Sequence, residues 1–240
     1  MTERLLPSLR VTVFSDYICP FCYLGYLRLE RLRSRYDLKV NWCLLEIHAD
    51  IPPQGGSFAA LGYTPGRWER LRSDLQVEAE ADHVRLGGLH CTANSHKALL
   101  LAEAAKEEGA GVFYRLHRRL FEAYLCDGLD IGNERVLEEL ALAAGAPPQL
   151  AERAWDEPRY ELKLRHYALA ARELGVTATP TFFFDERGLT GLQPLQSLLA
   201  AAQTAVHGGP PPDTPENLSC PATTSCNQVP ASSTKSQKFS

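Results

Sequence analysis

Long hydrophobic runs and an excess of charge of one sign are both missing from this sequence. No stretch approaches the roughly 18 consecutive apolar residues that identify a transmembrane helix. The 25 basic and 29 acidic side chains leave a formal net charge of −4, and their spacing produces no basic face. The composition therefore argues against a membrane partner and against a nucleic-acid partner.

The first residues also lack the features of a secretory signal peptide. Residues 1–10 read MTERLLPSLR, with no apolar core and no small-residue cleavage site. We therefore expect a cytoplasmic protein, in a compartment where thiols are kept reduced. The 7 cysteines, an odd number, then favour thiol chemistry or metal binding over a disulfide framework.

The pattern of apolar residues predicts a mixed sheet with a long helical insertion. Hydrophobic residues make up 45% of the chain, as in ordinary globular proteins. Alternation and β-branched runs predict strands, and recurrence every three to four residues predicts helices. The expected elements are a strand at 11–14, a helix at 20–36, a strand at 39–47, helices throughout 64–174, strands at 180–184 and 189–192, and a helix at 194–206.

This order places the helices between the second and third strands of one α/β unit. We expect a discontinuous sheet-bearing domain formed by residues 1–56 and 175–207, and a helical insertion domain at 57–174. Residues 208–240 are rich in Gly, Pro, Ser and Thr and have few apolar side chains, which predicts a flexible tail. That tail carries a second cysteine pair, Cys220 and Cys226.

The motif Cys19-Pro20-Phe21-Cys22, at the expected start of the first helix, carries the clearest chemical signal. Two cysteines at this spacing can reach disulfide distance, and the helix N-terminus stabilises a thiolate. Pro20 suits the first helical turn, where its missing N–H costs nothing. A zinc site is the alternative, but structural zinc normally requires a second short-spaced pair of ligands. The spacing therefore favours redox chemistry and predicts no metal.

A second motif, Thr179-Pro180, opens the strand at 180–184. A proline at this place is either an ordinary residue of an edge strand or a cis-proline held for a functional reason. Because cis bonds are rare, the residues alone favour the ordinary alternative.

Taken together, these motifs resemble the DsbA-type thioredoxin-fold family, specifically its FrnE-like branch. The resemblance begins with Ser15-Asp16 leading to Cys19-Pro20-Phe21-Cys22-Tyr23, followed far downstream by Thr179-Pro180-Thr181. Further similar segments, over roughly residues 11–206, are Leu45-Glu46-Ile47-His48-Ala49-Asp50 (with Ala49 where the family usually has proline), Asn94-Ser95-His96-Lys97, Leu120-Phe121-Glu122-Ala123-Tyr124, Asp130-Ile131-Gly132 and Gly191-Leu192-Gln193-Pro194. The resemblance implies a thioredoxin-like fold with a helical insertion, a catalytic dithiol, and a cis peptide bond at Pro180 beside it.

Carried over to this sequence, the resemblance assigns roles to the residues of both motifs. Cys19 would be the nucleophile and Cys22 the resolving thiol, while Thr179 and Pro180 would present backbone to a substrate peptide. Phe21 stands where strongly oxidising relatives have a histidine that can donate to the thiolate, so we expect a more moderate redox poise. Glu46 is either a buried proton relay near the dithiol or an ordinary solvated or capping acid.

The expected activity is thiol–disulfide exchange on protein or peptide disulfides, without a cofactor, and with a cellular thiol reductant as partner. The tail pair is either a second dithiol that exchanges with Cys19 and Cys22 or two incidental thiols. The tail pair can reach the Cys19–Cys22 motif, because the 13 flexible residues from His207 to Cys220 span about 20 Å on average and about 45 Å when fully extended. The alternatives are a glutathione-dependent isomerase of the 2-hydroxychromene-2-carboxylate type, and a metal-binding or peptide-holding module.

Overall fold

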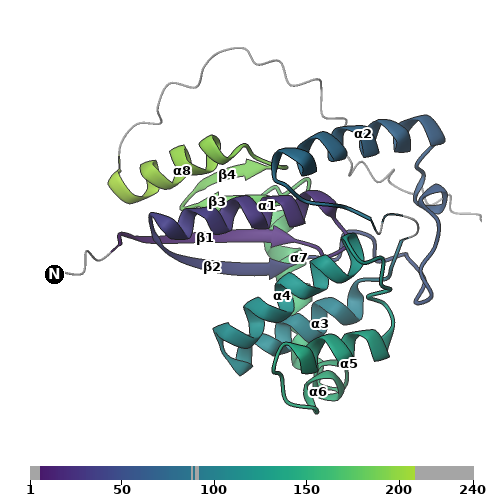
Figure 1. Ribbon diagram of the computed structural model, residues 1–240. Helices are drawn as coiled ribbons and strands as arrows, with labels where there is room; N and C mark the ends of the chain where they lie inside the picture. Colours follow the sequence, from purple (N-terminus) through teal and green to yellow (C-terminus); the bar gives the residue numbers. More distant parts are fainter. Residues whose placement is uncertain (1–5, 88, 90–91, 209–240) are drawn as a thin grey trace, which may run out of the picture.

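The computed structural model describes residues 6–87, 89 and 92–208, and its centre is a four-stranded sheet (Figure 1). The strand order is β2-β1-β3-β4. β1 and β2 are parallel, β3 is antiparallel to β1, and β4 is antiparallel to β3. The strands are β1 (Ser8–Ser15), β2 (Asp37–Leu44), β3 (Thr181–Phe184) and β4 (Arg187–Thr190).

Strand β1 shows why this segment forms the centre of the sheet. Leu9, Val11 and Val13 are buried, and Arg10 between them is exposed, which is the two-residue period of a strand with one covered face. At the end of the strand, Phe14 is buried as well, because a helix covers the second face there. β1 therefore extends further in both directions than the apolar run at 11–14 predicts.

Helices cover both faces of the sheet (Figure 1). The helices are α1 (Pro20–Glu30), α2 (Pro65–Ala81), α3 (His96–Ala105), α4 (Ala110–Leu125), α5 (Glu134–Ala143), α6 (Leu150–Asp156), α7 (Pro158–Glu173) and α8 (Leu195–His207). α1 and α8 cover one face, where Leu198 and Ala201 share a core with Val11 and Val13. α7 covers part of the other face, where Ala171 packs with Phe14 and Cys43. The α/β class with helices inserted between the second and third strands is confirmed.

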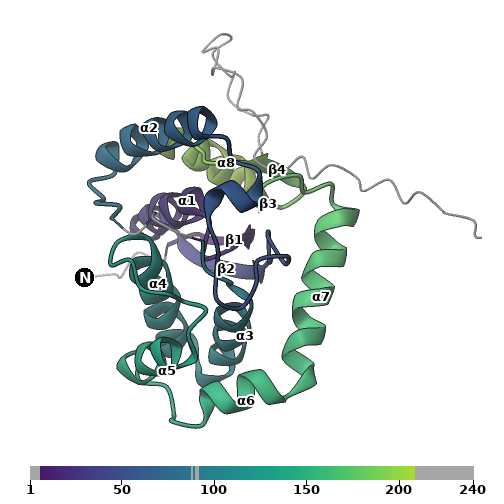
Figure 2. The same ribbon diagram turned by 90° about the vertical axis from the view of Figure 1, so that its right-hand side faces the viewer.

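The inserted helices separate into two groups, which the sequence does not predict. Helices α3 to α6 lie together on one side of the sheet, and α7 leads back from them to β3 (Figure 2). Helix α2 instead lies over α1, on the opposite side of the molecule (Figures 1 and 2). The segment expected as one insertion at 57–174 is therefore continuous in sequence but forms two groups of helices in space.

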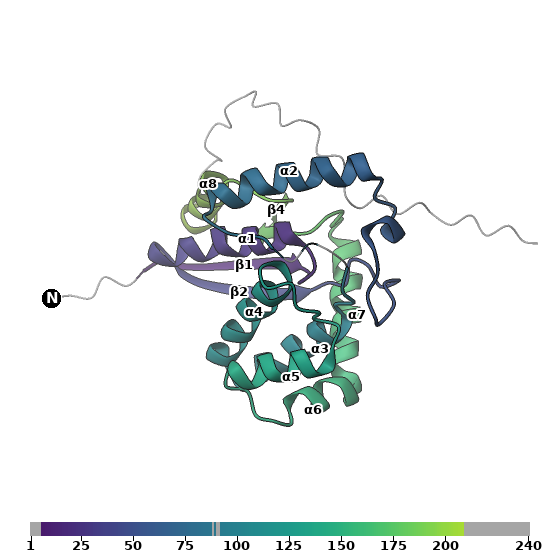
Figure 3. The same cartoon turned by 45° about the vertical axis from the view of Figure 1, so that its right-hand side comes forward.

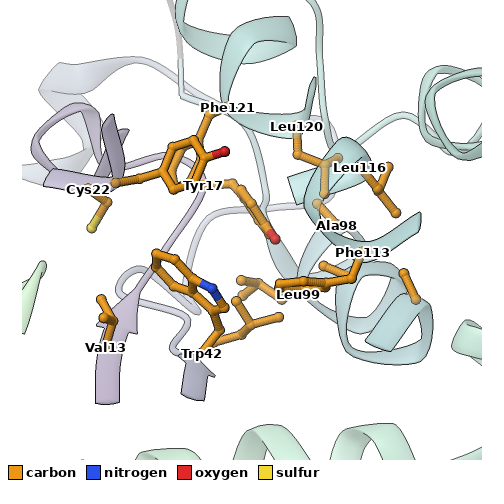
Figure 4. Close-up of a cluster of buried hydrophobic side chains, with 14 of the residues drawn as sticks. Val13, Tyr17, Cys22, Trp42, Ala98, Leu99, Phe113, Leu116, Leu120 and Phe121 are labelled. Carbon is orange, nitrogen blue, oxygen red and sulfur yellow. The ribbon is translucent and has the colours of Figure 1, made fainter. Parts of the chain in front are cut away.

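A cluster of buried aromatic and aliphatic side chains joins the sheet to the inserted helices (Figure 4). Tyr17, Cys22 and Trp42 come from the β1–α1–β2 unit, and Phe113 and Phe121 come from α4. The start of α1 therefore packs directly on the insertion, so the two parts share one core.

None of the helices in the described ranges is long and apolar enough to cross a membrane. The expected flexible tail, with Cys220 and Cys226, lies outside the described residues.

Candidate active site

The two cysteines of the first motif lie at the start of α1, as predicted. Cys19 is the N-cap residue in an extended conformation, and Pro20 occupies the first helical position. The Cys19 carbonyl oxygen accepts hydrogen bonds from the backbone N–H groups of Cys22 and Tyr23, at 3.0 and 3.4 Å. This first turn brings the Cys22 side chain back to the Cys19 thiol, with which it forms a hydrogen bond.

Both thiols are shielded from solvent, Cys22 more completely than Cys19. Their exposed fractions are 1% and 7%. Burial raises the pKa of the Cys22 thiol, but the hydrogen bond from Cys19 and the nearby Ser15 hydroxyl outweigh it, so the pKa of Cys22 lies below its ordinary value. The hydrogen bond to Cys22 is the main reason why the pKa of Cys19 lies well above its ordinary value. The two thiols therefore titrate as one coupled pair, with the pKa of Cys22 lowered and the pKa of Cys19 raised by their mutual hydrogen bond.

The second motif of the sequence meets the first in space. The Thr179–Pro180 peptide bond is cis. The Cys19 thiol donates a hydrogen bond to the Thr179 carbonyl oxygen, with 3.5 Å between sulfur and oxygen, although the two residues are 160 positions apart. Thr179 and Pro180 are buried, and β3 begins immediately after them. A carbonyl oxygen of the main chain is therefore fixed beside the more exposed sulfur.

Phe21, between the two cysteines, is half-buried and offers no hydrogen-bond donor to the sulfurs. It packs against the main core and also against a small cluster that contains Leu24, Leu75 and Ala79. Phe21 therefore links the dithiol helix to α2, a contact that the spacing of the motif does not reveal.

Asp16 is the site residue whose role sequence reasoning missed. Its carboxyl accepts backbone hydrogen bonds from Ile18 (3.3 Å) and Ile47 (2.9 Å), and it is 1% exposed. Burial raises the pKa of Asp16 to about 6, and the charge of Glu46 adds to this rise. The backbone of Asp16 also hydrogen-bonds to Cys22. The backbone of Asp16 therefore contacts the resolving thiol, while its carboxyl, which titrates near neutral pH, is buried against the N–H groups of Ile18 and Ile47.

Glu46, considered above as a proton relay or an ordinary acid, belongs to a second polar group next to Asp16. Its Oε2 lies 2.9 Å from Nδ1 of His96, whose Nε2 lies 3.2 Å from Oε2 of Glu161. The hydrogen bond to Glu46 is the main reason why the pKa of His96 is raised above its ordinary value. Glu46 therefore contacts the start of α3 and, through His96, α7.

A second buried titratable group, His117 on α4, is not identified by any motif. Its Nδ1 lies 2.7 Å from the Tyr17 hydroxyl, and the rings of Trp42, Phe113 and Phe121 surround it. Burial lowers the pKa of His117 to about 3, so the ring is neutral at neutral pH. Only the helical register of α4 could have indicated an inward-facing side chain here.

Within the part of the chain that the structure describes, no three His, Cys, Asp or Glu side chains gather as a metal ion would require. The proposed second redox pair, Cys220 and Cys226, lies outside the described residues, so its proximity to Cys19 stays a prediction.

Comparisons with known proteins place this site in a family. Residues 10–203 match the family described as "DSBA-like thioredoxin domain". The protein YwbO of Bacillus subtilis (strain 168) is 26% identical over 188 residues, which are 77% of this chain and 90% of YwbO.

Two solved structures show the same fold. A "probable DsbA oxidoreductase" of Streptomyces coelicolor superposes with a TM-score of 0.74 at 23% identity, covering 86% of this chain and 93% of the other. A 2-hydroxychromene-2-carboxylate isomerase superposes with a TM-score of 0.64 at 20% identity, covering 80% of this chain and 94% of the other. With most of its length matched, and with its dithiol placed at the start of α1, the chain belongs to the DSBA-like thioredoxin domain family.

Proposed function

We propose that this protein is a thiol–disulfide oxidoreductase that acts on protein or peptide disulfides through Cys19 and Cys22. The observation that carries the proposal is the pairing of two hydrogen-bonded thiols with the Thr179 carbonyl oxygen, 3.5 Å from the Cys19 sulfur. The family membership supports the same class of activity.

The reaction needs two exchanges. Cys19 first passes its proton to the Cys22 thiolate along the hydrogen bond between the two sulfurs. The resulting Cys19 thiolate attacks one sulfur of a substrate disulfide, so a Cys19–substrate disulfide forms and the other substrate sulfur leaves as a thiolate. Cys22 then loses its proton and attacks the Cys19 sulfur, which forms the Cys19–Cys22 disulfide and releases the second substrate thiolate. The substrate is reduced by two electrons and the enzyme is oxidised by two. A cellular thiol returns the enzyme to the dithiol by the same exchanges in reverse.

Asp16 is the proton acceptor that this second step requires. Cys22 is closed to solvent, so its proton needs an acceptor inside the protein, and Asp16 is our candidate because its backbone bonds to Cys22 and its carboxyl is buried. With its pKa raised to about 6, Asp16 is ionised at neutral pH and still basic enough to take a proton. Because Phe21 donates nothing to the sulfurs, the Cys19–Cys22 couple has a moderate reduction potential among its relatives.

The remaining parts of the proposal concern the surroundings of the reaction. The protein acts in the cytoplasm, where a thiol reductant is available. The tail pair Cys220 and Cys226 exchanges with the dithiol as a relay, and tethering gives it an effective concentration of about millimolar. Truncation after His207 tests the relay, because loss of turnover supports it and unchanged turnover contradicts it.

The central experiment uses single cysteine variants in an insulin-reduction assay with a dithiol reductant. Cys19→Ser should abolish turnover, and Cys22→Ser should accumulate a mixed disulfide between Cys19 and the substrate, identified by peptide mass spectrometry. Cys126→Ser is the matched control, since this half-buried thiol lies outside the motif. Activity in Cys19→Ser equal to that of the wild type would contradict the proposal.

The glutathione-dependent isomerase remains the second candidate because one such enzyme shares the fold. The two activities differ in their need for Cys22. An isomerase that uses one thiol would keep its activity in Cys22→Ser, whereas the dithiol reaction cannot be completed without it. Measuring both activities in this one variant separates the candidates.

A further inference from the structure

The nucleophile of the proposed reaction is largely closed to solvent in this structure. Cys19 is 7% exposed, although its sulfur has to reach a substrate disulfide. The face of α1 that begins at Phe21 is covered by α2 and by the segment that follows it. Phe21 packs there against a small apolar cluster, whose buried members are Leu24, Leu75 and Ala79 and whose half-buried members include Val84, Leu86, Leu89 and Leu192.

Few apolar contacts hold α2 in this position. Only Leu75 and Ala79 are buried among its 17 residues, whereas eight of the ten residues of α3 are buried. Val77, on the outer surface of α2, is 64% exposed. Because buried apolar area is the main source of stability, α2 is attached much more weakly than α3.

Ion pairs also attach α2, one from the half-exposed Arg31 to Asp82 at 3.1 Å and two from a buried arginine. Arg28 of α1 donates hydrogen bonds from Nε to Asp82 and from Nη2 to Glu78, each at 2.6 Å. Its Nη1 donates to the Gln193 carbonyl oxygen at 3.0 Å. The side chains of Arg28 and Asp82 are 8% and 4% exposed, so this contact is protected from water. We call Arg28, Glu78 and Asp82 the latch.

The latch holds the C-terminal half of α2, and the other half extends past the dithiol. Leu75 and Ala79 of α2 pack near Leu24 of α1. About one turn further along each helix, the carboxylates at the end of α2 bond to Arg28 of α1. The two helices therefore run in similar directions, and Figures 1 and 3 show the first turns of α2 projecting beyond the start of α1.

A half-buried aromatic cluster joins the projecting end of α2 to the segment that precedes it. The rings of Phe58 and Trp68 stack with 3.8 Å between their centroids, and Tyr63 packs edge-on against both. Aromatic side chains of this kind bind peptide side chains well, because each presents a large rigid surface. Of the three, only Trp68 belongs to α2, so any displacement of α2 changes the packing of Trp68 against Phe58 and Tyr63.

We propose that α2 is a cap that selects substrates for the dithiol, and that the latch holds it closed. Resting on the proposed function, this inference names the substrate class: with the latch closed, Cys19 accepts disulfides in small or extended peptides. A disulfide in a folded protein reaches Cys19 only when the latch opens. The latch residues are thus positioning residues, which act on the substrate through α2.

Alkylation of Cys19 tests the cap without any turnover. The double variant Glu78→Gln/Asp82→Asn removes both carboxylates of the latch, and Glu80→Gln is the control, an exposed acid of α2 bonded only to Gln76 in the described contacts. Reduced protein is treated with iodoacetamide or with a large polyethylene-glycol maleimide, and labelling of Cys19 is followed by peptide mass spectrometry. We expect a several-fold faster reaction with the large reagent in the double variant, and much less change with the small one.

The control and a milder variant keep this test decisive. Glu80→Gln should label like the wild type, and Glu78→Gln alone, at a side chain that is 44% exposed, should fold normally and give an intermediate rate. Equal rates with the large reagent in the wild type and in both latch variants would overturn the proposal, as would the same increase in Glu80→Gln.

A second measurement addresses selectivity itself. The ratio of kcat/KM for a folded disulfide protein to kcat/KM for a short disulfide peptide should rise several-fold in Glu78→Gln, and an unchanged ratio would contradict the substrate assignment. A wild type with no turnover on either substrate would refute the proposed function instead, and the alkylation rates would still decide whether α2 is a cap.

Discussion

Gly25 of α1 lies against Pro180 so closely that a side chain would not fit between them. A β-carbon placed on Gly25 would be 3.1 Å from Cγ of Pro180 and 2.9 Å from the ring of Phe182. The distance between the dithiol helix and the loop that carries Thr179 is therefore set by a residue without a side chain.

Gly25→Ala should lower both stability and activity. Alanine alone would favour the helix by about 1 kcal/mol, but pressing a methyl group into this contact costs about 1–3 kcal/mol, and both Pro180 and Phe182 are buried. We expect a net loss in urea unfolding and slower insulin reduction. Gly66→Ala in α2 is the control, because its β-carbon would meet only the end of Arg70 at 3.9 Å. A Gly25→Ala protein as stable and active as the control would show that the contact is not tight.

Asp16→Asn should change the pH dependence of stability between pH 4 and 6. This window lies between the ordinary pKa of the Asp16 carboxyl, 3.8, and its pKa of about 6 in the folded protein. The folded state holds the proton more strongly, so the wild type is relatively most stable at low pH and loses stability as pH rises through this window. The difference between these two pKa values corresponds to about 3 kcal/mol. Between pH 4 and 6, we expect the free energy of unfolding of the wild type to fall by about this amount relative to that of Asp16→Asn.

The measurement is urea unfolding of both proteins at several pH values, with the exposed Asp156→Asn as the control. Parallel curves for the wild type and Asp16→Asn would contradict a raised pKa of Asp16. The release of substrate from the mixed disulfide should also slow in the wild type below about pH 6, because Asp16 is then already protonated.

His117→Gln should make the protein more resistant to acid. The pKa of His117 falls from its ordinary 6.5 to about 3 in the folded protein, so the unfolded chain binds a proton that the folded state does not. The resulting stability is present above pH 6.5 and is lost as pH falls toward 3, by about 5 kcal/mol in total. Glutamine does not titrate and can still hydrogen-bond to Tyr17. Circular dichroism during acid titration should show this variant unfolding at lower pH than the wild type and than His166→Gln, an exposed control.

His96→Gln should remove a stabilising contribution that exists only at low pH. The pKa of His96 is raised, chiefly by Glu46, so its ion pairs with Glu46 and Glu161 are fully formed below pH 6.5 and are lost as pH rises through the folded-state pKa. We expect the wild type to exceed the variant in stability near pH 6 and to approach it near pH 9. The test is thermal unfolding across this range, and a constant difference between the two proteins would rule the explanation out.

The dithiol could be predicted from its local signature, and its partner loop only through the family resemblance. Cys19-Pro20-Phe21-Cys22 combines a reactive spacing with a helix start, and the resemblance extended this to Thr179-Pro180. Asp16 has no such signature. A single acid between Ser15 and Tyr17 looks like a turn residue, and its burial follows from Ile18 and Ile47, whose backbone N–H groups fold around it.

The position of α2 could not be predicted either. Its sequence has the composition of an exposed helix, with only Leu75 and Ala79 buried, so its periodicity says little about which partner it covers. The deciding contact is the pairing of Arg28 with Asp82, 54 positions later, and ion pairs between distant residues leave no pattern in a single sequence. The family membership confirms the DsbA-type resemblance, while the FrnE-like branch stays a prediction.

The 160 residues between Cys19 and Thr179 also determine the order in which a ribosome makes the site. At about 5–20 residues per second, the two thiols precede the loop that faces them by roughly 10–30 seconds. During that interval the nascent chain carries both sulfurs without the carbonyl oxygen that later lies beside Cys19, and without β3. The chain thus emerges first with a bare dithiol and gains its completed site only as its last strands are synthesised.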